Sequence, residues 1–313
     1  MKLVIQIPCY NEQDSILEVL KSIPKKIKGI DEIEIFVIDD GSCDNTSKNA
    51  KDFGVNIVEI AQRSGLSNAF KVGIKNALKK NADILVNIDG DNQYCANDIA
   101  KIIQPIIDNK CDIVVGARPI GKIREFSLLK KFLQRFGSFV VKLISGIDIK
   151  DAASGFRALN RKTMLKLNIF NNFTYTIEML IQAKSKNLIV KNIDINVNKQ
   201  KNRKSKLFKN NFDYIFKQTK NLIRFFIIYR PCRFFGLFSA LFFFFGFILG
   251  LRFLYFYFNF NGSGHIQSLI LCAILLTISF ISLMLAIVGD LLQVNRKILE
   301  DIQFEIRQNK YKK

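Results

Sequence analysis

The sequence has no tryptophan and only one histidine, and its six cysteines include no C-x-x-C pair. His265 lies in the short connection between two long apolar runs, which excludes histidine-based acid–base catalysis. Scattered cysteines fit a reduced compartment and argue against a structural metal site. The first residues, MKLVIQIPCY, lack the long apolar core and cleavage site of a signal peptide, so we expect them to form a strand.

Charged residues are missing from two long stretches near the C-terminus. None stands in 234–251, and the apolar run resumes after Arg252 as far as residue 258. A second uncharged stretch covers 266–289. A soluble helix needs a polar face, which neither stretch offers, and both are long enough to cross a bilayer. The sequence therefore predicts two transmembrane helices.

Lysine and arginine are also missing from the connection between these stretches, residues 259–265. Basic residues instead precede the first stretch and follow the second: Lys217, Lys220, Arg224, Arg230 and Arg233, then Arg296 and Lys297. This distribution predicts an integral membrane protein with both termini and the catalytic part cytoplasmic. Arg252 is the one discordant charge, and we expect its side chain to reach the headgroups.

The 47 Lys and Arg residues outnumber the 27 Asp and Glu residues, which gives a formal net charge of +20. This charge suits nucleic acid or an anionic membrane, and a solvated Lys-rich surface accounts for part of it. Because the predicted spans already place the chain at a membrane, we expect a membrane partner and no nucleic acid.

Before the apolar stretches, β-rich segments alternate with helical patterns. The segments are 3–7, 33–38, 55–60, 84–88 and 113–115. This alternation predicts an α/β fold with a Rossmann-like, mostly parallel sheet. Ligands bind such sheets beyond the carboxyl ends of the strands. Polar clusters follow four of the segments, at 8–12, 39–44, 89–93 and Arg118, so we expect one site there.

Asp89-Gly90-Asp91 follows one predicted strand. Two carboxylates separated by one residue reach a divalent cation bound to a diphosphate, and Gln93 supplies a third oxygen. Mg²⁺ or Mn²⁺ there would neutralise the charge on a leaving nucleoside diphosphate. The alternative for an isolated D-x-D is an ordinary turn, because Asp and Gly are common turn residues.

Asp39-Asp40 also follows a predicted strand, ahead of Asp44 and Thr46, which suit the start of a helix. Helix capping explains Asp44 or Thr46 but leaves the acidic pair unexplained. Acidic side chains at this place bind a ribose or a base in other doubly wound nucleotide-binding proteins.

Two segments combine apolar and basic residues at helical spacing, 122–144 and 208–226. Helices of this composition lie in the plane of a membrane surface. The alternative is a helix packed on the sheet, which fits the first segment equally well and the second less well.

Four motifs together resemble the family-two inverting glycosyltransferases of GT-A fold. In chain order they are Ile7-Pro8-Cys9-Tyr10-Asn11-Glu12, Val37-Ile38-Asp39-Asp40-Gly41-Ser42, Asp89-Gly90-Asp91-Asn92-Gln93 and Ser154-Gly155-Phe156-Arg157. The chain is most similar to the polyprenyl-phosphate glycosyltransferases, dolichol-phosphate mannosyltransferase-like, whose members often carry two C-terminal spans. The similarity continues into the stretch Tyr229-Arg230-Pro231 ahead of the first predicted span.

The resemblance implies a role for each motif. Donor-binding residues would be Pro8, Tyr10, Asn11, Glu12, Asp39, Asp40 and Asp89, with Asp40 on the nucleoside. Ligands of Mg²⁺ or Mn²⁺ would be Asp89, Asp91 and Gln93. Residues near the acceptor phosphate would be Arg118, Arg135, Ser154, Arg157, Ser205 and Lys206. Asp91, Asp151, Arg118 and Arg135 would be catalytic, and Asp151 would orient the reactants before acting as a base, since a phosphate monoester is already largely ionised.

The chain departs from the family in two places. Of the usual R-x-x-G-x-S-K stretch it keeps only Ser205-Lys206, with Gln200 and Arg203 where Arg and Gly are expected. Arg63 stands where Asn is commoner.

We therefore expect a GT-A domain over 1–206, an amphipathic interfacial region over 207–232, a transmembrane hairpin over 233–292 and a cytoplasmic tail helix over 293–313. The hairpin contains spans at about 234–258 and 266–289, by hydropathy. The expected activity is metal-dependent hexosyl transfer from a UDP- or GDP-sugar to undecaprenyl or dolichyl phosphate. The sugar and any homo-oligomer stay open.

Three rival functions follow from the same residues. A processive polysaccharide synthase needs a Q-x-x-R-W motif, which a chain without tryptophan lacks. A transferase acting on a lipid alcohol, such as ceramide or diacylglycerol, would need a true base. A non-catalytic membrane scaffold would have no need of clustered acids in a basic protein.

Overall fold

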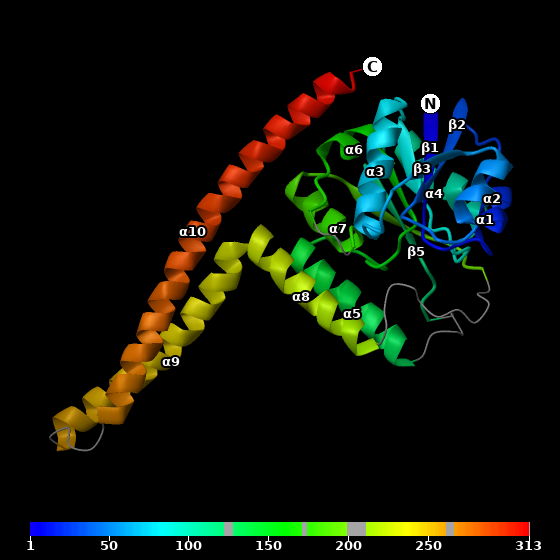
Figure 1. Cartoon of the computed structure of the whole chain (residues 1–313). Coiled ribbons are helices and arrows are strands. Elements are labelled where there is room, and N and C mark those ends of the chain that lie inside the picture. Colours follow the sequence, from blue (N-terminus) through cyan, green and yellow to red (C-terminus); the bar gives the residue numbers. More distant parts are fainter. Residues whose placement is uncertain (122–127, 171–173, 199–210, 261–265, 313) are drawn as a thin grey trace. The chain divides into compact units, whose positions relative to one another are not determined.

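The computed structural model describes residues 1–121, 128–170, 174–198, 211–260 and 266–312. The chain divides into two compact units (Figure 1). The first unit contains Met1–Ser205 together with Ile302–Lys313, and the second contains Lys206–Asp301. The last residues of the chain therefore belong with the N-terminal domain.

A seven-stranded sheet forms the centre of the first unit, in the order β3-β2-β1-β4-β6-β5-β7. The strands are β1 (Lys2–Cys9), β2 (Glu32–Asp39), β3 (Asn56–Glu59), β4 (Ile84–Asn87), β5 (Ile113–Ala117), β6 (Arg157–Asn160) and β7 (Val190–Asp194). Only β6 runs antiparallel to its neighbours. The predicted α/β fold with a mostly parallel sheet is confirmed, and β6 and β7 were not predicted.

The inner strands are apolar because both of their faces are covered. In β1 every residue from Leu3 to Cys9 is buried, and all of β4 is buried. The parallel register pairs β1 with β2 as far as Cys9 and Asp39. This register brings the polar residues that follow each strand to one edge of the sheet.

Helices cover the sheet and connect its strands. They are α1 (Ile16–Ser22), α2 (Thr46–Phe53), α3 (Leu66–Lys79), α4 (Ile99–Ile107), α5 (Leu128–Ser145), α6 (Arg161–Lys166) and α7 (Thr176–Ser185), with a 3₁₀ turn at Ala96–Asp98. Asn45 is the N-cap residue of α2, and its side chain makes no capping hydrogen bond, so neither Asp44 nor Thr46 caps the helix as the sequence suggested. Asp44 Oδ1 instead accepts from the Thr46 amide at 3.0 Å, in a turn just before the helix.

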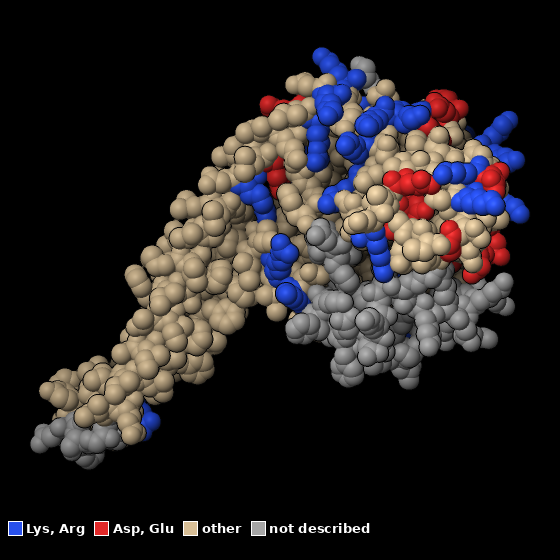
Figure 2. Space-filling model, viewed as in Figure 1, with Lys and Arg blue, Asp and Glu red and all other residues tan. Residues whose placement is uncertain are grey.

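Three helices make up the second unit: α8 (Asn211–Tyr229), α9 (Pro231–Phe260) and the first part of α10 (Ile266–Lys310). Helices α9 and α10 are long and apolar enough to cross a membrane, at Pro231–Asn259 and Ile266–Lys310. The face of these two helices that is seen in Figure 2 carries almost no charge over most of its length. The predicted second span and the predicted tail helix form one continuous helix.

Small residues allow α9 and α10 to approach closely. A Cβ atom on Gly250 would lie 3.2 Å from Cys272 Sγ, and one on Gly289 would lie 2.5 Å from Pro231 Cβ. Ser279 Oγ donates to the Ser239 carbonyl at 2.9 Å. Close packing of small residues and hydrogen bonds of this kind hold helices together in lipid, where the hydrophobic effect supplies no attraction between them.

The C-terminal segment contacts the end of α6 within the first unit. Arg307 Nη1 donates to the carbonyls of Leu165 and Leu167 at 3.2 and 2.7 Å. Lys166 Nζ lies 5.4 Å from the centre of the Phe304 ring. The last carbonyls of a helix have no partner within it and carry partial negative charge, so a guanidinium satisfies them.

Arg307→Ala is expected to loosen this C-terminal segment and to lower the free energy of unfolding by about 1–2 kcal/mol, since two carbonyls lose their donor. Limited chymotrypsin digestion should cut sooner after Phe304 or Tyr311. The exposed Lys310→Ala serves as the control and should digest like the wild-type protein. Equal digestion of the two variants would contradict the assigned contact.

Candidate active site

The first two motifs meet where β1 and β2 end. The Asn11 amide donates to Ser42 Oγ at 2.9 Å, and Asn11 Oδ1 accepts from the Cys43 amide at 2.8 Å. The Glu12 amide donates to Thr46 Oγ1 at 2.7 Å. Pro8 lies within β1 and is buried. The structure thus brings the predicted donor-binding residues of these two motifs together.

Asp39, the last residue of β2, and Asp40, which follows it, make different contacts. Asp39 Oδ1 accepts from the Ser42 amide at 2.9 Å and so shapes its own loop. Asp40 accepts from the amides of Ser64 and Gly65, both at 2.8 Å, and from Ser64 Oγ at 2.7 Å. Asp40 therefore fixes the loop that leads into α3, and its contact with a nucleoside stays a prediction.

Arg63 lies at the same edge of the sheet, with its guanidinium carbon 4.0 Å from the centre of the Tyr10 ring. Gly41 allows this approach, because a Cβ there would come within 2.8 Å of the Arg63 amide nitrogen. Its φ of +75° also favours glycine. The residue that departs from the family pattern is thus in contact with a predicted donor-binding residue.

Asp89 follows β4, and its Oδ1 is shielded from solvent with no hydrogen-bond partner among the described residues. Burial, and then the charge of Asp91, raise the pKa of Asp89 to about 7. The charge of Arg118 opposes this rise in the pKa, but Arg118 makes no hydrogen bond to Asp89 Oδ1. Such an oxygen fits a metal ligand, which needs a lone pair free of other partners.

Asp91 and Gln93 lie in the loop beyond Asp89. Asp91 Oδ1 accepts from the Gln93 amide at 3.0 Å, and Gln93 Oε1 accepts from Arg118 Nη1 at 3.3 Å. Among the described residues no three His, Cys, Asp or Glu side chains are gathered closely enough to hold a metal by themselves. Mg²⁺ commonly takes only one or two carboxylates and completes its shell with phosphates and water, so this donor set fits a diphosphate-bound ion.

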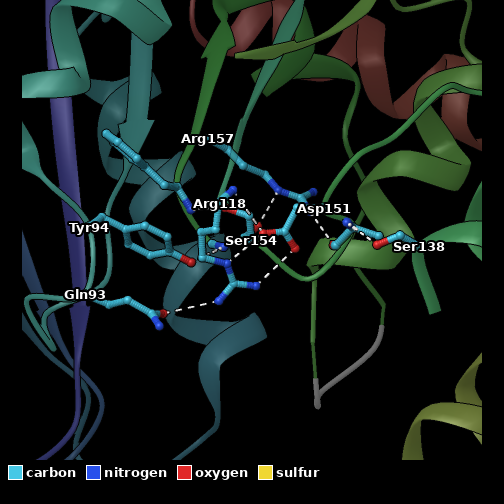
Figure 3. Close-up of polar contacts among 10 residues, drawn as sticks. Gln93, Tyr94, Arg118, Ser138, Asp151, Ser154 and Arg157 are labelled. Carbon is cyan, nitrogen blue, oxygen red and sulfur yellow. Dashed lines mark hydrogen bonds and ion pairs between the residues drawn. The ribbon is translucent and has the colours of Figure 1, made fainter. Parts of the chain in front are cut away.

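Arg118 and Asp151 form a buried ion pair (Figure 3). Arg118 Nε donates to Asp151 Oδ2 at 2.6 Å, and Nη2 donates to Oδ1 at 3.0 Å. Their side chains are 6% and 1% exposed. A bidentate pair fixes the plane of the guanidinium, so Asp151 holds Arg118 beside Gln93.

Arg157 and Ser154 are both fully buried. Arg157 donates to the carbonyls of Ala152, Ser154 and Thr176 at 2.8, 2.9 and 2.7 Å (Figure 3). Ser154 Oγ accepts from the Phe156 amide at 3.3 Å. This placement does not support the predicted contact of either residue with the acceptor phosphate. Both shape the loop that carries Asp151.

Three predicted site residues remain, Arg135, Ser205 and Lys206. Arg135 is exposed on α5, and its Nη2 lies 3.0 Å from the position of a Cβ on Gly121, close in sequence to Arg118. Ser205 and Lys206 lie outside the described residues, as do Gln200 and Arg203.

Three residues that sequence reasoning missed tie the site together. Asn87 Nδ2 donates to the Gly155 carbonyl at 2.8 Å and to Tyr175 Oη at 2.9 Å. Tyr94 Oη accepts from the Gly155 amide at 2.9 Å. Asn87 stands in an otherwise apolar strand, and its Oδ1 accepts from Gln6 Nε2 of β1. A polar residue in each of two apolar strands was the feature of the sequence that could have indicated this buried network.

The sheet order, with one antiparallel strand between parallel ones and the polar cluster at its edge, is that of a GT-A fold. Glucosyl-3-phosphoglycerate synthase from Mycobacterium tuberculosis shares it, with a TM-score of 0.56 and 19% identity. That likeness covers 72% of this chain and 78% of the other.

Residues 4–167 match the model of glycosyl transferase family 2, and the chain belongs to this family. It is 32% identical to the UDP-N-acetylglucosamine–dolichyl-phosphate N-acetylglucosaminyltransferase of Methanococcus voltae, over 52% of this chain and 70% of that protein. It is also 32% identical to the dolichol-phosphate mannosyltransferase of Pyrococcus furiosus, over 59% of this chain and 53% of that protein. The undecaprenyl-phosphate mannosyltransferase of Micrococcus luteus is 25% identical to this chain, over 54% of this chain and 70% of that protein. The family resemblance is confirmed.

Proposed function

We propose that the protein transfers a sugar from a UDP- or GDP-sugar to a polyprenyl phosphate, undecaprenyl or dolichyl phosphate, at the cytoplasmic face of a membrane. The observation that carries the proposal is the buried Arg118–Asp151 pair, which holds the Arg118 guanidinium, our predicted ligand of the acceptor phosphate, directly beside Gln93 of the acidic motif. Relatives named for transfer to dolichyl and undecaprenyl phosphate support this choice of acceptor.

The donor would lie over the ends of β1 and β2, near Tyr10 and Asp40. Asp89, Asp91 and Gln93 would hold Mg²⁺ or Mn²⁺, which neutralises the diphosphate as it leaves. The structures of glucosyl-3-phosphoglycerate synthase with Mn²⁺ and UDP are compatible with such a site. Buried Asp89 Oδ1 supports the assignment from this chain's own residues.

The acceptor phosphate would meet Arg118 and, from α5, Arg135. A guanidinium binds two phosphate oxygens at once and screens the repulsion between acceptor and donor phosphates. An acceptor oxygen then bonds to the anomeric carbon as the bond to the nucleoside diphosphate breaks, and attack from the opposite face inverts the configuration. No base is needed, because the phosphate is already ionised. Asp151 orients Arg118, in line with its contacts.

The membrane would deliver the acceptor. Helices α9 and α10 qualify as spans by length and composition. Basic residues flank the pair on both sides and none stands in the connection, so the positive-inside rule favours a cytoplasmic catalytic unit.

The test offers membranes that contain the protein a panel of UDP- and GDP-sugars, each with undecaprenyl phosphate, dolichyl phosphate, ceramide or diacylglycerol. A new glycolipid from a polyprenyl phosphate alone is expected. A glycolipid formed from ceramide or diacylglycerol would show that the acceptor is a lipid alcohol and not a polyprenyl phosphate. Failure to bind any nucleotide sugar with Mn²⁺ would favour a scaffold.

Binding of Mn²⁺ with UDP is expected to strengthen as the pH rises, because the Asp89 carboxyl, with a pKa of about 7, must lose its proton to act as a ligand. Affinity should rise several-fold between about pH 6 and pH 7.5 and then level off. Calorimetry in buffers of different ionisation enthalpy should detect a released proton. The Asp89→Asn variant should bind Mn²⁺ with UDP weakly, and its affinity should not change with pH in this range. An equal pH dependence in this variant would show that Asp89 is not the titrating ligand.

The raised pKa also predicts the pH dependence of stability without metal. The proton on Asp89 favours the folded state fully below about pH 4, and this contribution is lost as the pH rises through about 7. The melting temperature of the metal-free protein should therefore fall between about pH 4 and pH 7, relative to that of the Asp89→Asn variant.

A further inference from the structure

Tyr94 stands directly after Gln93 and is 2% exposed. Its ring lies 5.4 Å from the Phe156 ring and 6.0 Å from the Arg118 guanidinium carbon. Its hydroxyl accepts from the Gly155 amide at 2.9 Å. The Tyr94 side chain therefore connects the acidic motif, Arg118 and the loop before β6 (Figure 3).

Gly155 is the residue of that loop that lies close to Asp89 of the acidic motif. A Cβ there would lie 2.5 Å from Asp89 Oδ2 and 2.7 Å from Oδ1, so only glycine fits. The Gly155 carbonyl accepts from Asn87 and, at 3.1 Å, from Tyr175 Oη. The carbonyl thus has two donors, whereas Tyr94 is the acceptor that the structure shows for the amide.

Loss of the Tyr94 hydroxyl would leave a buried amide without its acceptor, and the loop would have to turn to satisfy it. The same loop carries Asp151, which sets the plane of Arg118. A displacement of the loop would reach the acceptor phosphate through that pair. Ring contacts with Phe156 and Arg118 do not depend on the hydroxyl.

We propose that Tyr94 is a positioning residue, whose hydroxyl sets the loop of Asp151 and Gly155 against the acidic motif and so aligns the acceptor phosphate with the donor. This inference rests on the proposed function. Tyr94 follows the metal motif in sequence and would act on the acceptor through Gly155, without contacting either substrate.

Tyr94→Phe tests the inference, because it removes the hydroxyl and keeps the ring. The purified full chain is assayed with undecaprenyl phosphate and with the nucleotide sugar that the wild-type protein uses. We expect kcat/KM for the acceptor to fall about tenfold, with the dissociation constant of UDP–Mn²⁺ within about twofold of wild type. A merely structural role would weaken donor and acceptor together.

Tyr175→Phe is the matched control, since it removes another hydroxyl bonded to Gly155 while Asn87 still donates to the same carbonyl. Its stack on Phe70, at 3.8 Å between ring centres, is kept. We expect kcat/KM for the acceptor to fall by about threefold or less in this control variant.

Wild-type acceptor kinetics in Tyr94→Phe, or equal losses of donor and acceptor binding, would overturn the inference. A Tyr175→Phe loss as large as that of Tyr94→Phe would do the same. If the wild-type protein makes no glycolipid with any donor of the panel, the proposed function fails, and the inference falls with it.

Discussion

Asp91→Ala is expected to abolish glycolipid formation, lowering kcat by about a thousandfold or more. Loss of a carboxylate from a catalytic metal site forfeits several kcal/mol of charge stabilisation on the leaving diphosphate. Asp91 is half-buried, and its Oδ1 already orders the loop by accepting from the Gln93 amide. The measurement is transfer of labelled sugar to lipid, with membrane insertion followed by fractionation.

The exposed Asp52→Ala on α2 provides the control, because it removes one negative charge from the same unit away from the acidic motif. It should keep wild-type activity. An undiminished yield from Asp91→Ala would reject the metal assignment, and equal losses in both variants would point to net charge instead.

Asp151→Ala is expected to destabilise the catalytic unit by about 3–5 kcal/mol and to remove nearly all transfer. The change leaves the Arg118 guanidinium buried without its partner, and an uncompensated buried charge is costly. Chemical denaturation of the full chain measures the first effect, and acceptor kinetics measure the second.

The surface pair of Asp194 and Lys150 offers a matched comparison, since their side chains are 72% and 60% exposed. Asp194→Ala should cost less than about 1 kcal/mol, as exposed ion pairs do. A similar small cost for Asp151→Ala would show that the buried pair does not organise the site.

The edge of the sheet was predictable from the sequence because of how parallel strands end. Polar residues after β1, β2 and β4 had to meet once those strands were recognised, and the register of Cys9 with Asp39 brings them together. Strand β6 was not predictable in the same way. Its four residues, RALN, carry no alternation, and their place between β4 and β5 depends on tertiary pairing.

The acceptor side of the site was less predictable, because a sequence does not tell whether an arginine is exposed. Arg118 and Arg157 both stand beside polar loops and both carry a charge suited to phosphate. The structure separates them: Arg118 donates to the side chains of Asp151 and Gln93, whereas Arg157 donates to backbone carbonyls. Tyr94 was overlooked for a related reason, since a buried aromatic residue is ordinarily a core residue.

The most direct test of the account compares two lipids that differ only in the phosphate. Purified protein with Mn²⁺ and its nucleotide sugar is given either undecaprenyl phosphate or undecaprenol. Labelled product is expected with the phosphate alone, because Arg118 is proposed to bind phosphate oxygens and no residue need then deprotonate an alcohol. Transfer to undecaprenol at a comparable rate would contradict it.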